Sequence, residues 1–429
     1  MIRVLSIVIA AVVASFYYFP FIFTFFPMAN TKMVLALFGL ILLIFNAASQ
    51  RKAKIGKDLL SLSLFALCVS LASLISMVYN NTHDGSYLTY IISMWVWLSA
   101  AYFMLSIIKK VHGVVSVELV CFYLIGVGTL QCVLAICIDN IPLVKSFVDS
   151  FLYNWKFDGR LYGIGCAVDV GGGRLAVLLV MIAYLIPKMI RQKRSNVHIA
   201  LLCICYFIIA TLGNMIGRTT SIGLLVSIVY MIYAGIFNNA LTRKFRIWFG
   251  GALLVCVLLV TYLYRSNLYW EGQLRFAFEG FFSLVEQGKW NVQSNNMLAK
   301  GFIYPDNIKT WLIGDGYMAD PYNDPYYVGE ATYGYYKNTD AGYSRFLFYF
   351  GMLGLFFFSI FMIKACHVNV RKLPRYKLMF LMILALNFII WIKVSTDIFL
   401  AVAPFLCISA EENEVYARQI EDNKETIPS

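Results

Sequence analysis

The sequence predicts an all-α protein that crosses a membrane many times. Of its 429 residues, 60% are hydrophobic and only 14% are charged, and the mean hydropathy is +0.72. Apolar runs of the length that a transmembrane helix needs, about 17–25 residues, recur from one end to the other. Lys and Arg gather in short stretches between these runs. Together these observations indicate a polytopic membrane protein and exclude a soluble domain.

About twelve stretches have the length and apolarity of a span. The first contains Pro20, which predicts a broken helix, and the eighth and twelfth are short. No small-residue cleavage site precedes a polar start, so we expect an uncleaved first span and not a signal peptide. The stretches are 4–27, 33–49, 58–79, 88–108, 118–138, 166–188, 197–215, 222–237, 247–264, 341–364, 378–394 and 396–410.

The chain is expected to divide into four parts. Residues 1–264 form a bundle of about nine spans with a medium loop at 139–165. Residues 265–339 form one large loop, 340–410 hold the last three spans, and 411–429 form a polar tail. Long loops are unusual in a compact bundle and commonly carry function.

Within the large loop, the stretch QLRFAFEGFFSLVEQG (273–288) predicts one amphipathic, aromatic helix. No internal repeat of the kind that marks many transporters is evident.

The distribution of Lys and Arg predicts the orientation in the membrane. With twelve spans, the basic stretches near residues 51–57, 109–110, 188–194, 243–246 and 364–377 all fall on one side. Positive loops face the cytoplasm, so both termini are expected there and the large loop lies outside. The net charge of +12 is explained by these loops and does not indicate a nucleic-acid partner.

Common catalytic and metal-binding motifs are missing from the sequence. The ten cysteines lie in or beside apolar runs without CxxC spacing, and we interpret them as packing residues. No G-x-S-x-G, Walker loop or H-E-x-x-H is present, which argues against a serine hydrolase, an ATP-driven pump or a zincin. We therefore predict no cofactor and no metal.

Four arginines on the predicted outer side are candidate anion ligands: Arg160, Arg174, Arg218 and Arg345. Each has a structural alternative, either reaching the interface or pairing with a carboxylate such as Asp169 or Glu279. The guanidinium fork suits phosphate oxygens, so a group of arginines at the outer face favours a lipid diphosphate. Neighbouring glycines would allow backbone N–H groups to approach the same anion.

Asp340 stands at the predicted start of the tenth span. As an N-cap, together with Thr339, it would be structural, whereas as a base it would accept a proton from an attacking hydroxyl. The loop carboxylates Asp315, Asp320 and Asp324 do not have EF-hand spacing, and Gly314 and Gly316 indicate a turn. A tyrosine-rich stretch follows, suited to interfacial packing or to stacking on sugars: Tyr326, Tyr327, Tyr333, Tyr335 and Tyr336.

The segments RFAFEGF, GDGYM and TDAGYSRFLFYFGMLG, with GRLYGIG and GRTTSIG upstream, resemble the O-antigen polymerases (Wzy) of Gram-negative bacteria. The resemblance covers about residues 155–355 and extends to the O-antigen ligases. Against the ligase motif, Asp340 stands at the His, Tyr343 at the Tyr, and Gly351 and Gly354 at the glycines. Because the His is missing, the pattern favours a polymerase.

The resemblance implies an inner-membrane, metal-independent, inverting glycosyltransferase. It would join undecaprenyl-diphosphate-linked repeat units at the periplasmic face, with a chain-length regulator as an expected partner. Asp340, Arg218 and Arg345 are then the expected catalytic residues, and Arg160, Arg174, Glu279, Asp315 and Tyr343 the expected ligands of diphosphate or glycan. The alternatives are an O-antigen ligase, which uses the same donor, and a polysaccharide flippase, for which paired repeats would be expected.

Overall fold

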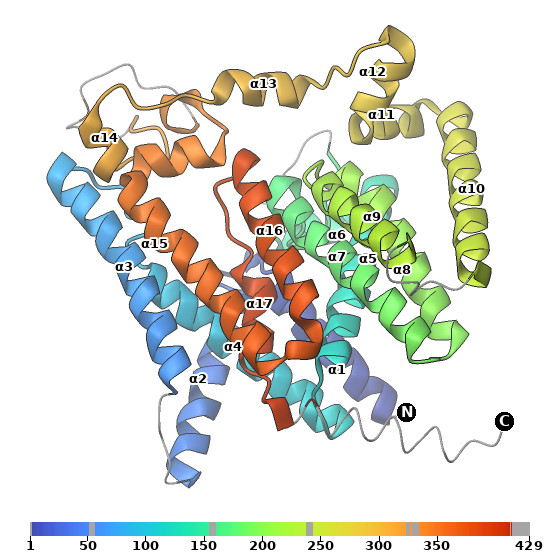
Figure 1. Ribbon diagram of the computed structural model, residues 1–429, viewed down its shortest axis with the longest axis horizontal. Helices are drawn as coiled ribbons and strands as arrows, with labels where there is room; N and C mark the ends of the chain where they lie inside the picture. The colour runs from blue at the N-terminus through green and yellow to red at the C-terminus, as the bar shows by residue number, and fades with distance from the viewer. Residues whose placement is uncertain are drawn as a thin grey trace. The chain divides into compact units, whose positions relative to one another are not determined.

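The computed structural model describes residues 2–50, 56–153, 160–236, 243–322, 327, 334–411 and 413 (Figure 1). The chain divides into two compact units, and each is described by itself. Unit 1 consists of Met1–Thr31 and Ile107–Val292, and unit 2 of Lys32–Ser106 and Gln293–Ser429. The boundary at residue 292 lies inside the loop that the sequence predicted as one part.

Nine helices among the described residues are long and apolar enough to cross a membrane, so the chain is a multi-pass α-helical membrane protein. All nine coincide with predicted spans. They are α2 (Thr31–Gln50), α3 (Lys57–Asn80), α4 (Tyr90–His112), α5 (Val117–Asn140), α7 (Val168–Arg191), α8 (Asn196–Ile216), α10 (Arg243–Ser266), α15 (Gly342–Lys372) and α16 (Lys377–Lys393, continuous with the short turn η2, Pro374–Tyr376).

The other three predicted spans correspond to helices of 17 residues or fewer. Helix α9 (Thr220–Ile236) and helix α1 (Ile2–Tyr18) have 17 residues each. Helix α17 (Phe399–Leu406) has only 8 residues, all buried, so the prediction of a span at 396–410 was wrong. The stretch before it is polar, and Asn387 Oδ1 accepts a hydrogen bond from the Ile398 amide, which fixes the turn between α16 and α17.

The predicted first span, 4–27, is broken at Pro20, as the sequence predicted, because α1 ends at Tyr18 ahead of the proline. The proline disfavours helical geometry for the preceding residue. The chain then forms an antiparallel hairpin of β1 (Ile22–Phe23) and β2 (Phe26–Asn30), which the all-α prediction did not include. Part of the aromatic stretch that was predicted as the end of the first span therefore forms this hairpin.

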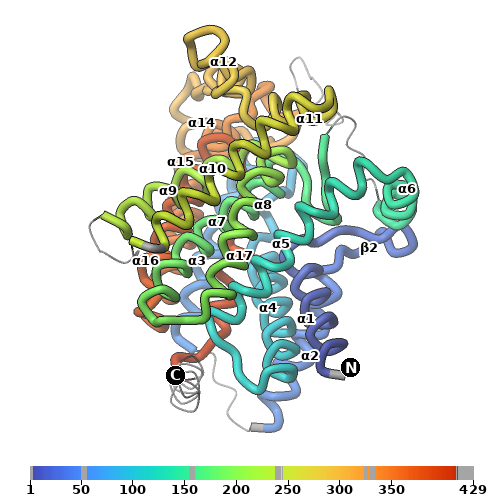
Figure 2. The backbone as a smooth tube through the Cα atoms, turned by 90° about the vertical axis from the view of Figure 1, so that its right-hand side faces the viewer, coloured from blue at the N-terminus to red at the C-terminus, as the bar shows by residue number. Residues whose placement is uncertain are grey.

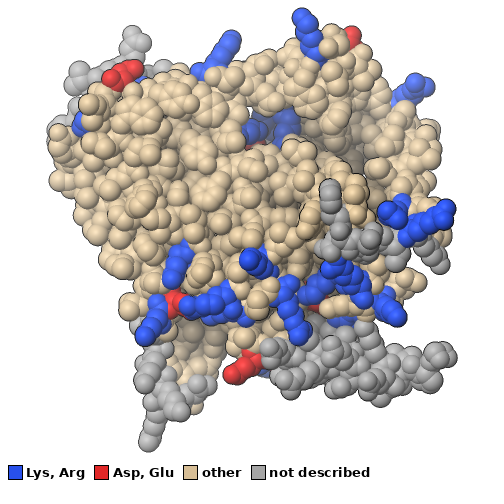
Figure 3. All heavy atoms as spheres, in the orientation of Figure 1, with Lys and Arg blue, Asp and Glu red and all other residues tan. Residues whose placement is uncertain are grey.

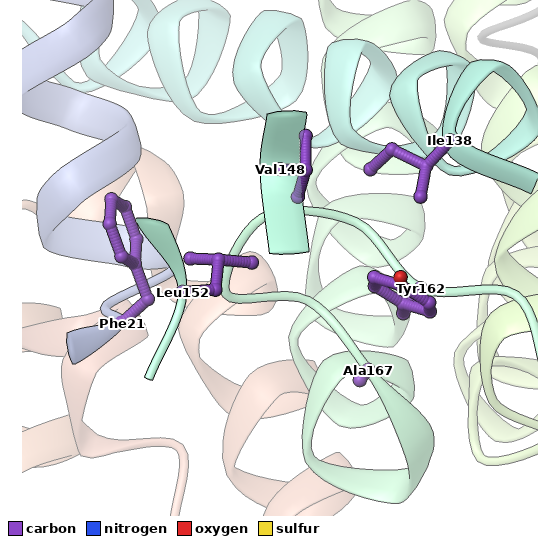
Figure 4. Close-up of a cluster of buried hydrophobic side chains, with 6 residues drawn as sticks. All are labelled: Phe21, Ile138, Val148, Leu152, Tyr162 and Ala167. Atoms are coloured by element: carbon purple, nitrogen blue, oxygen red, sulfur yellow. The ribbon is translucent and has the colours of Figure 1, made fainter. Parts of the chain in front are cut away.

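The hairpin is held by a helix in the medium loop, α6 (Pro142–Phe151) (Figure 2). The Thr24 amide donates to the Phe151 carbonyl, and the Tyr153 amide donates to the Ile22 carbonyl, each at 2.9 Å. A buried cluster lies beneath the two elements, drawn in Figure 4: Phe21, Ile138, Val148, Leu152, Tyr162 and Ala167.

The core of unit 1 is α7, which packs on α5, α8 and α9. Glycines make this close packing possible. A Cβ at Gly172 would lie 2.8 Å from the Gly217 carbonyl oxygen, and a Cβ at Gly223 would overlap the backbone of Ala176. Small residues at such seams are typical of helix packing in membranes.

The predicted helix 273–288 is two helices, α11 (Leu268–Ala277) and α12 (Glu279–Gln287). Phe278 separates them, with φ −122° and ψ 30°. The prediction was wrong in its continuity but right in its helical character. Unit 2 continues the loop with α13 (Gln293–Gly301), α14 (Ile308–Ile313) and the turn η1 (Tyr336–Asn338).

Unit 2 is built around α15, which packs on α3, α14, α16 and α17. Helix α15 has 31 residues but is broken at Gly351, whose φ is 65° and ψ is −166°. Figure 1 shows the resulting bend beside α14. The part after the break is itself long enough to span a bilayer. The first turns of α15 therefore form a separate segment, Gly342–Phe350.

The break is closed by the turn after α14. The Asp315 amide donates to the Phe348 carbonyl at 2.5 Å, and the Gly316 amide donates to the Tyr349 carbonyl at 3.1 Å. These carbonyls lose their helical partners at the break, and an unsatisfied carbonyl is costly in a membrane protein. Gly314 lies in the same glycine-only region, with φ 78° and ψ −174°.

Tyr349 ties the segment before the break to the α3–α4 turn. Its hydroxyl donates to the Asp84 carbonyl at 2.8 Å and accepts from the Tyr87 amide at 3.1 Å. The Ser73 hydroxyl lies 2.7 Å from the same oxygen. Ser76 Oγ donates to the Tyr349 carbonyl at 2.7 Å.

Gly351→Ala is expected to destabilise the protein. The backbone conformation at Gly351 costs other residues about 1–3 kcal/mol, and a Cβ there would overlap the backbone of Leu312 and Ile313. Thermal unfolding in detergent should show a clearly lower midpoint. The control is Gly250→Ala in α10, where a Cβ meets nothing within 4 Å and should leave the midpoint equal or higher. Equal midpoints for wild type and Gly351→Ala would contradict this account of the break.

Candidate functional site

The predicted site residues form two sets, one in each unit, and each set is described by itself. Unit 1 holds four of them, namely Arg160, Arg174, Arg218 and Glu279, and unit 2 holds the other four, namely Asp315, Asp340, Tyr343 and Arg345.

In unit 1, two of the arginines meet on one aromatic ring. The guanidinium carbon of Arg218 lies 4.5 Å from the centre of the Phe276 ring, and that of Arg160 lies 5.6 Å from it. Arg218 also forms an ion pair with Glu279. We name Arg160, Arg218, Phe276 and Glu279 the arginine–phenylalanine group.

Three separate parts of the sequence supply this group. Arg218 stands in the tight turn between α8 and α9, where the Thr220 amide donates to the Gly217 carbonyl at 2.9 Å. Arg160 precedes α7. Phe276 and Glu279 flank the break between α11 and α12, so the break directs both side chains to the same place.

The arginine–phenylalanine group has a net positive charge and is accessible to solvent. Arg160 is exposed, and the side chains of Arg218 and Glu279 are 20% and 31% exposed. Two guanidinium groups against one carboxylate leave one net positive charge, so the group suits an anion. Phe276 supplies a flat face that positions the guanidinium groups by cation–π contact.

Arg174 has a different environment from the other two arginines of unit 1. Its Nη1 donates to the Gly165 carbonyl at 3.4 Å, and its carbonyl accepts from the Tyr18 hydroxyl at 3.1 Å. Nearby, Thr219 Oγ1 donates to Asp169 Oδ1 at 2.5 Å and joins the turn after α8 to the start of α7. These contacts hold the Arg174 side chain to the loop before α7 and the Asp169 side chain to the turn after α8.

The amide N–H groups of three glycines near the arginines are hydrogen-bonded to backbone carbonyls and do not face an anion. The amides of Gly171 and Gly217 each donate to a backbone carbonyl at 2.9 Å, and that of Gly163 does so at 2.7 Å. The expectation that such N–H groups face a shared anion is wrong at these three positions. A Cβ at Gly217 would overlap the Val168 backbone, whereas a Cβ at Gly163 would meet the Gln131 side chain at 2.5 Å and one at Gly171 would lie 3.1 Å from Cys166.

In unit 2, Asp315 is the centre of a polar network. Its Oδ1 accepts from Lys309 Nζ and from Thr310 Oγ1, each at 2.6 Å. Its Oδ2 accepts from the Tyr336 hydroxyl at 3.3 Å. Burial and the charge of Asp315 raise the pKa of Tyr336, so this hydroxyl stays protonated and remains a donor. The network holds the turn that closes the break in α15.

Arg345 lies in the segment before the break in α15, and not deep within an unbroken span. Its guanidinium stacks on Tyr335, with 3.6 Å from the guanidinium carbon to the ring centre. Nη2 makes one long hydrogen bond, 3.4 Å, to the Met318 carbonyl. Nε is buried and has no hydrogen-bond partner among the described residues. The guanidinium therefore retains donors for a ligand.

Asp340 does not cap α15. The helix begins at Gly342 with Ala341 as N-cap, and Thr339 Oγ1 accepts from the Ala341 amide at 3.2 Å. Thr339 also donates to the Gly301 carbonyl at the end of α13. The structural alternative for Asp340 is therefore wrong. Its carboxylate is exposed and acts electrostatically on Arg345, so it is open to a substrate.

Tyr343 faces α16. Its hydroxyl donates to the Phe388 carbonyl at 3.0 Å, and its ring meets Trp391 edge to face at 6.1 Å. Gly354, the second motif glycine, lies against the Phe350 ring. Tyr343 therefore packs the first segment of α15 on α16, and Gly354 allows its two segments to come close together.

The described loop tyrosines pack mainly on one another. Tyr317, Tyr336 and Phe348 form a buried cluster against which Tyr327 packs, whereas Tyr335 is 45% exposed under Arg345. Tyr326, Tyr333 and Asp324 lie outside the described residues, as does nearly all of the predicted tail.

Three residues of these groups were not singled out from the sequence. The position of Phe276 between Arg275 and Glu279, in an aromatic helix, could have indicated it from the sequence. Lys309 and Asp84 had none. Asp84 Oδ2 accepts from the amides of Met318 and Ala319, at 2.7 and 3.1 Å, and so fixes the chain segment whose Met318 carbonyl bonds Arg345. Within the described ranges, no three His, Cys, Asp or Glu side chains form a group that would hold a metal ion.

Comparison with known proteins identifies no relative: neither a protein-family model, nor a curated protein, nor a solved structure matches the chain significantly. Functional interpretation therefore depends on the residues and their geometry.

Arg218 and Phe276 are expected to be energetically coupled. A double-mutant cycle with Arg218→Gln and Phe276→Leu, measured by unfolding in detergent, should give about 0.5–2 kcal/mol. The matched cycle replaces Phe281, which is 61% exposed and meets the Trp290 ring at 5.3 Å, and should give a value near zero. Equal coupling in both cycles would mean that the cation–π contact is not formed.

Proposed function

We propose that this chain is a glycosyltransferase of the O-antigen polymerase type. It joins undecaprenyl-diphosphate-linked oligosaccharide units at the periplasmic face of the inner membrane. The observation that carries the proposal is the meeting of Arg160 and Arg218 on Phe276. The resemblance of the surrounding segments to that family supports the same assignment.

The arginine–phenylalanine group is assigned to the diphosphate of the donor. A diphosphate offers several oxygens to two guanidinium forks, which bind such groups in pairs of hydrogen bonds. Arg218 is paired with Glu279 in the structure, so an incoming diphosphate would exchange with that carboxylate. As the glycosidic C–O bond breaks, negative charge grows on the leaving diphosphate, and fixed cations stabilise it.

In unit 2, Asp340 is assigned to the acceptor hydroxyl and Arg345 is a further candidate ligand of the diphosphate. The nonreducing sugar hydroxyl of the acceptor attacks the anomeric carbon of the donor. A new C–O bond forms, the bond to diphosphate breaks, and the hydroxyl proton passes to a base. Asp340 is exposed and is not used as a helix cap, so its carboxylate is available for that proton. Arg345 offers the donors that the protein leaves unbonded.

The test is complementation of a strain in which the gene is deleted, read from the lipopolysaccharide bands on a gel. The deletion should leave core with a single repeat unit. Arg218→Ala and Asp340→Asn should fail to restore the ladder, because one loses a diphosphate ligand and the other loses the base. Arg218→Lys should restore it weakly, since Lys keeps the charge but lacks the fork.

The matched control is Arg275→Ala in α11, which removes an arginine that pairs with Glu271 and Glu286 outside the group. It should restore the full ladder. Membrane levels of every variant are compared by immunoblot. Long polymer on the lipid carrier with none on core would instead identify a ligase. Single units trapped on the cytoplasmic side would identify a flippase, and full ladders from both variants would refute the assigned roles.

A further inference from the structure

We propose that unit 1 holds a groove that binds an anionic phospholipid, between the first turns of α8 and those of α10. A cavity of about 810 Å³ lies there, lined by α8, α10 and the chain that connects α7 to α8. Its volume falls in the range of small-molecule sites, about 300–1,000 Å³. The inference does not depend on the proposed glycosyltransferase activity.

One wall of the groove is a stripe along α8, formed by Ile199, Cys203 and Phe207. These residues are four apart, so they follow one face of the helix for about 12 Å at 1.5 Å per residue. The stripe contains no charged side chain. Its length and apolarity suit an extended acyl chain.

The opposite wall is the matching face of α10, with Phe245, Trp248 and Phe249 at helical spacing. Phe249 stacks on Phe207 with ring centres 5.4 Å apart, which joins the two walls, and Phe245 stacks on Phe249 at 5.7 Å. Helix α10 is otherwise uncovered, because none of its most apolar window is buried within the protein. The groove therefore opens towards the hydrocarbon of the bilayer, from which an acyl chain would enter.

The end of the groove at the start of α8 is cationic and carries Lys193 and Arg194. Arg194 Nη2 bonds Glu118 Oε2 at 3.1 Å, and Lys188 Nζ bonds Oε1 of the same carboxylate at 3.1 Å. Three cations against one carboxylate leave two net positive charges. Arg194 Nε is buried with no hydrogen-bond partner among the described residues. Lys193 is exposed and has no carboxylate within ion-pair distance among them.

The amides at the start of α8 strengthen the same end. Ser195 caps the helix, accepting from the Val197 amide at 3.3 Å, and Asn196 lines the cavity. A helix N-terminus favours an anion. Basic pockets between transmembrane helices bind anionic lipid headgroups. Figure 3 shows Lys and Arg gathered in groups on a mostly uncharged surface.

A phospholipid matches both parts of the groove. Its acyl chain would lie between α8 and α10, and its phosphate would bind Lys193 and Arg194. A zwitterionic lipid would fill the apolar part but gain less at the cationic end. A soluble phosphate would lack the apolar part. The groove thus selects for a phospholipid with net negative charge.

The experiment uses the full chain, purified and delipidated in detergent, with phosphatidylglycerol or phosphatidylcholine titrated in and bound lipid counted by native mass spectrometry. Phosphatidylglycerol should bind at least about five-fold more tightly, the factor expected from one basic residue at an anionic lipid. Lys193→Gln should abolish most of this preference. Lys110→Gln, which removes an exposed lysine at the end of α4, should leave it unchanged.

Two further variants test the apolar part from opposite walls. Ala200→Trp on α8 and Ala252→Trp on α10 place a large ring in the groove at exposed positions, so the fold should persist. Both should weaken binding of both lipids. Equal binding of the two lipids to wild type, an unchanged preference in Lys193→Gln, or unaltered affinity in both Trp variants would overturn the proposal. Competition by millimolar inorganic phosphate would also overturn it, because it would indicate a site for a soluble anion.

Discussion

The architecture of unit 2 depends on how the broken backbone of α15 is satisfied. At Gly351 the helical ladder stops, and the carbonyls of Phe348 and Tyr349 receive the amides of Asp315 and Gly316 in its place. In a membrane protein such an exchange has to be complete, because no water compensates for a missing partner. The turn after α14, although it belongs to a loop, therefore supplies the hydrogen-bond donors that α15 lacks at its break.

This arrangement explains why polar residues accumulate around the turn. Lys309 and Thr310 hold the Asp315 carboxylate, which in turn keeps the turn against α15. Arg345 lies in the segment ahead of the break, and not in the long part of α15 that follows it. Arg345 needs no carboxylate partner at hydrogen-bond distance there, because Tyr335 shields one face of its guanidinium.

Length and apolarity were sufficient to predict the nine long helices, since a span is defined by a continuous apolar run. They failed at residues 19–30, where the pairing with α6 decides between helix and hairpin. They failed again at α17, whose burial against α15 makes a short apolar helix stable. The break at Gly351 had only a glycine as its signal. The sequence singled out Arg160 and Arg218 as candidate anion ligands by type and position. It did not indicate Phe276 as their meeting point, because that depends on the break after α11.

The number of hydrogens on the Tyr349 hydroxyl fixes which of its hydrogen bonds it donates and which it accepts. It has a single hydrogen, and the Asp84 carbonyl, which can only accept, takes it at 2.8 Å. Ser73 must then be the donor in its 2.7 Å contact with Tyr349. The direction of every hydrogen bond at this oxygen is thereby fixed, with one outgoing and two incoming. A phenylalanine at this position would leave the Asp84 carbonyl and the Tyr87 amide without this partner, so one oxygen atom joins α15 both to α3 and to the α3–α4 turn.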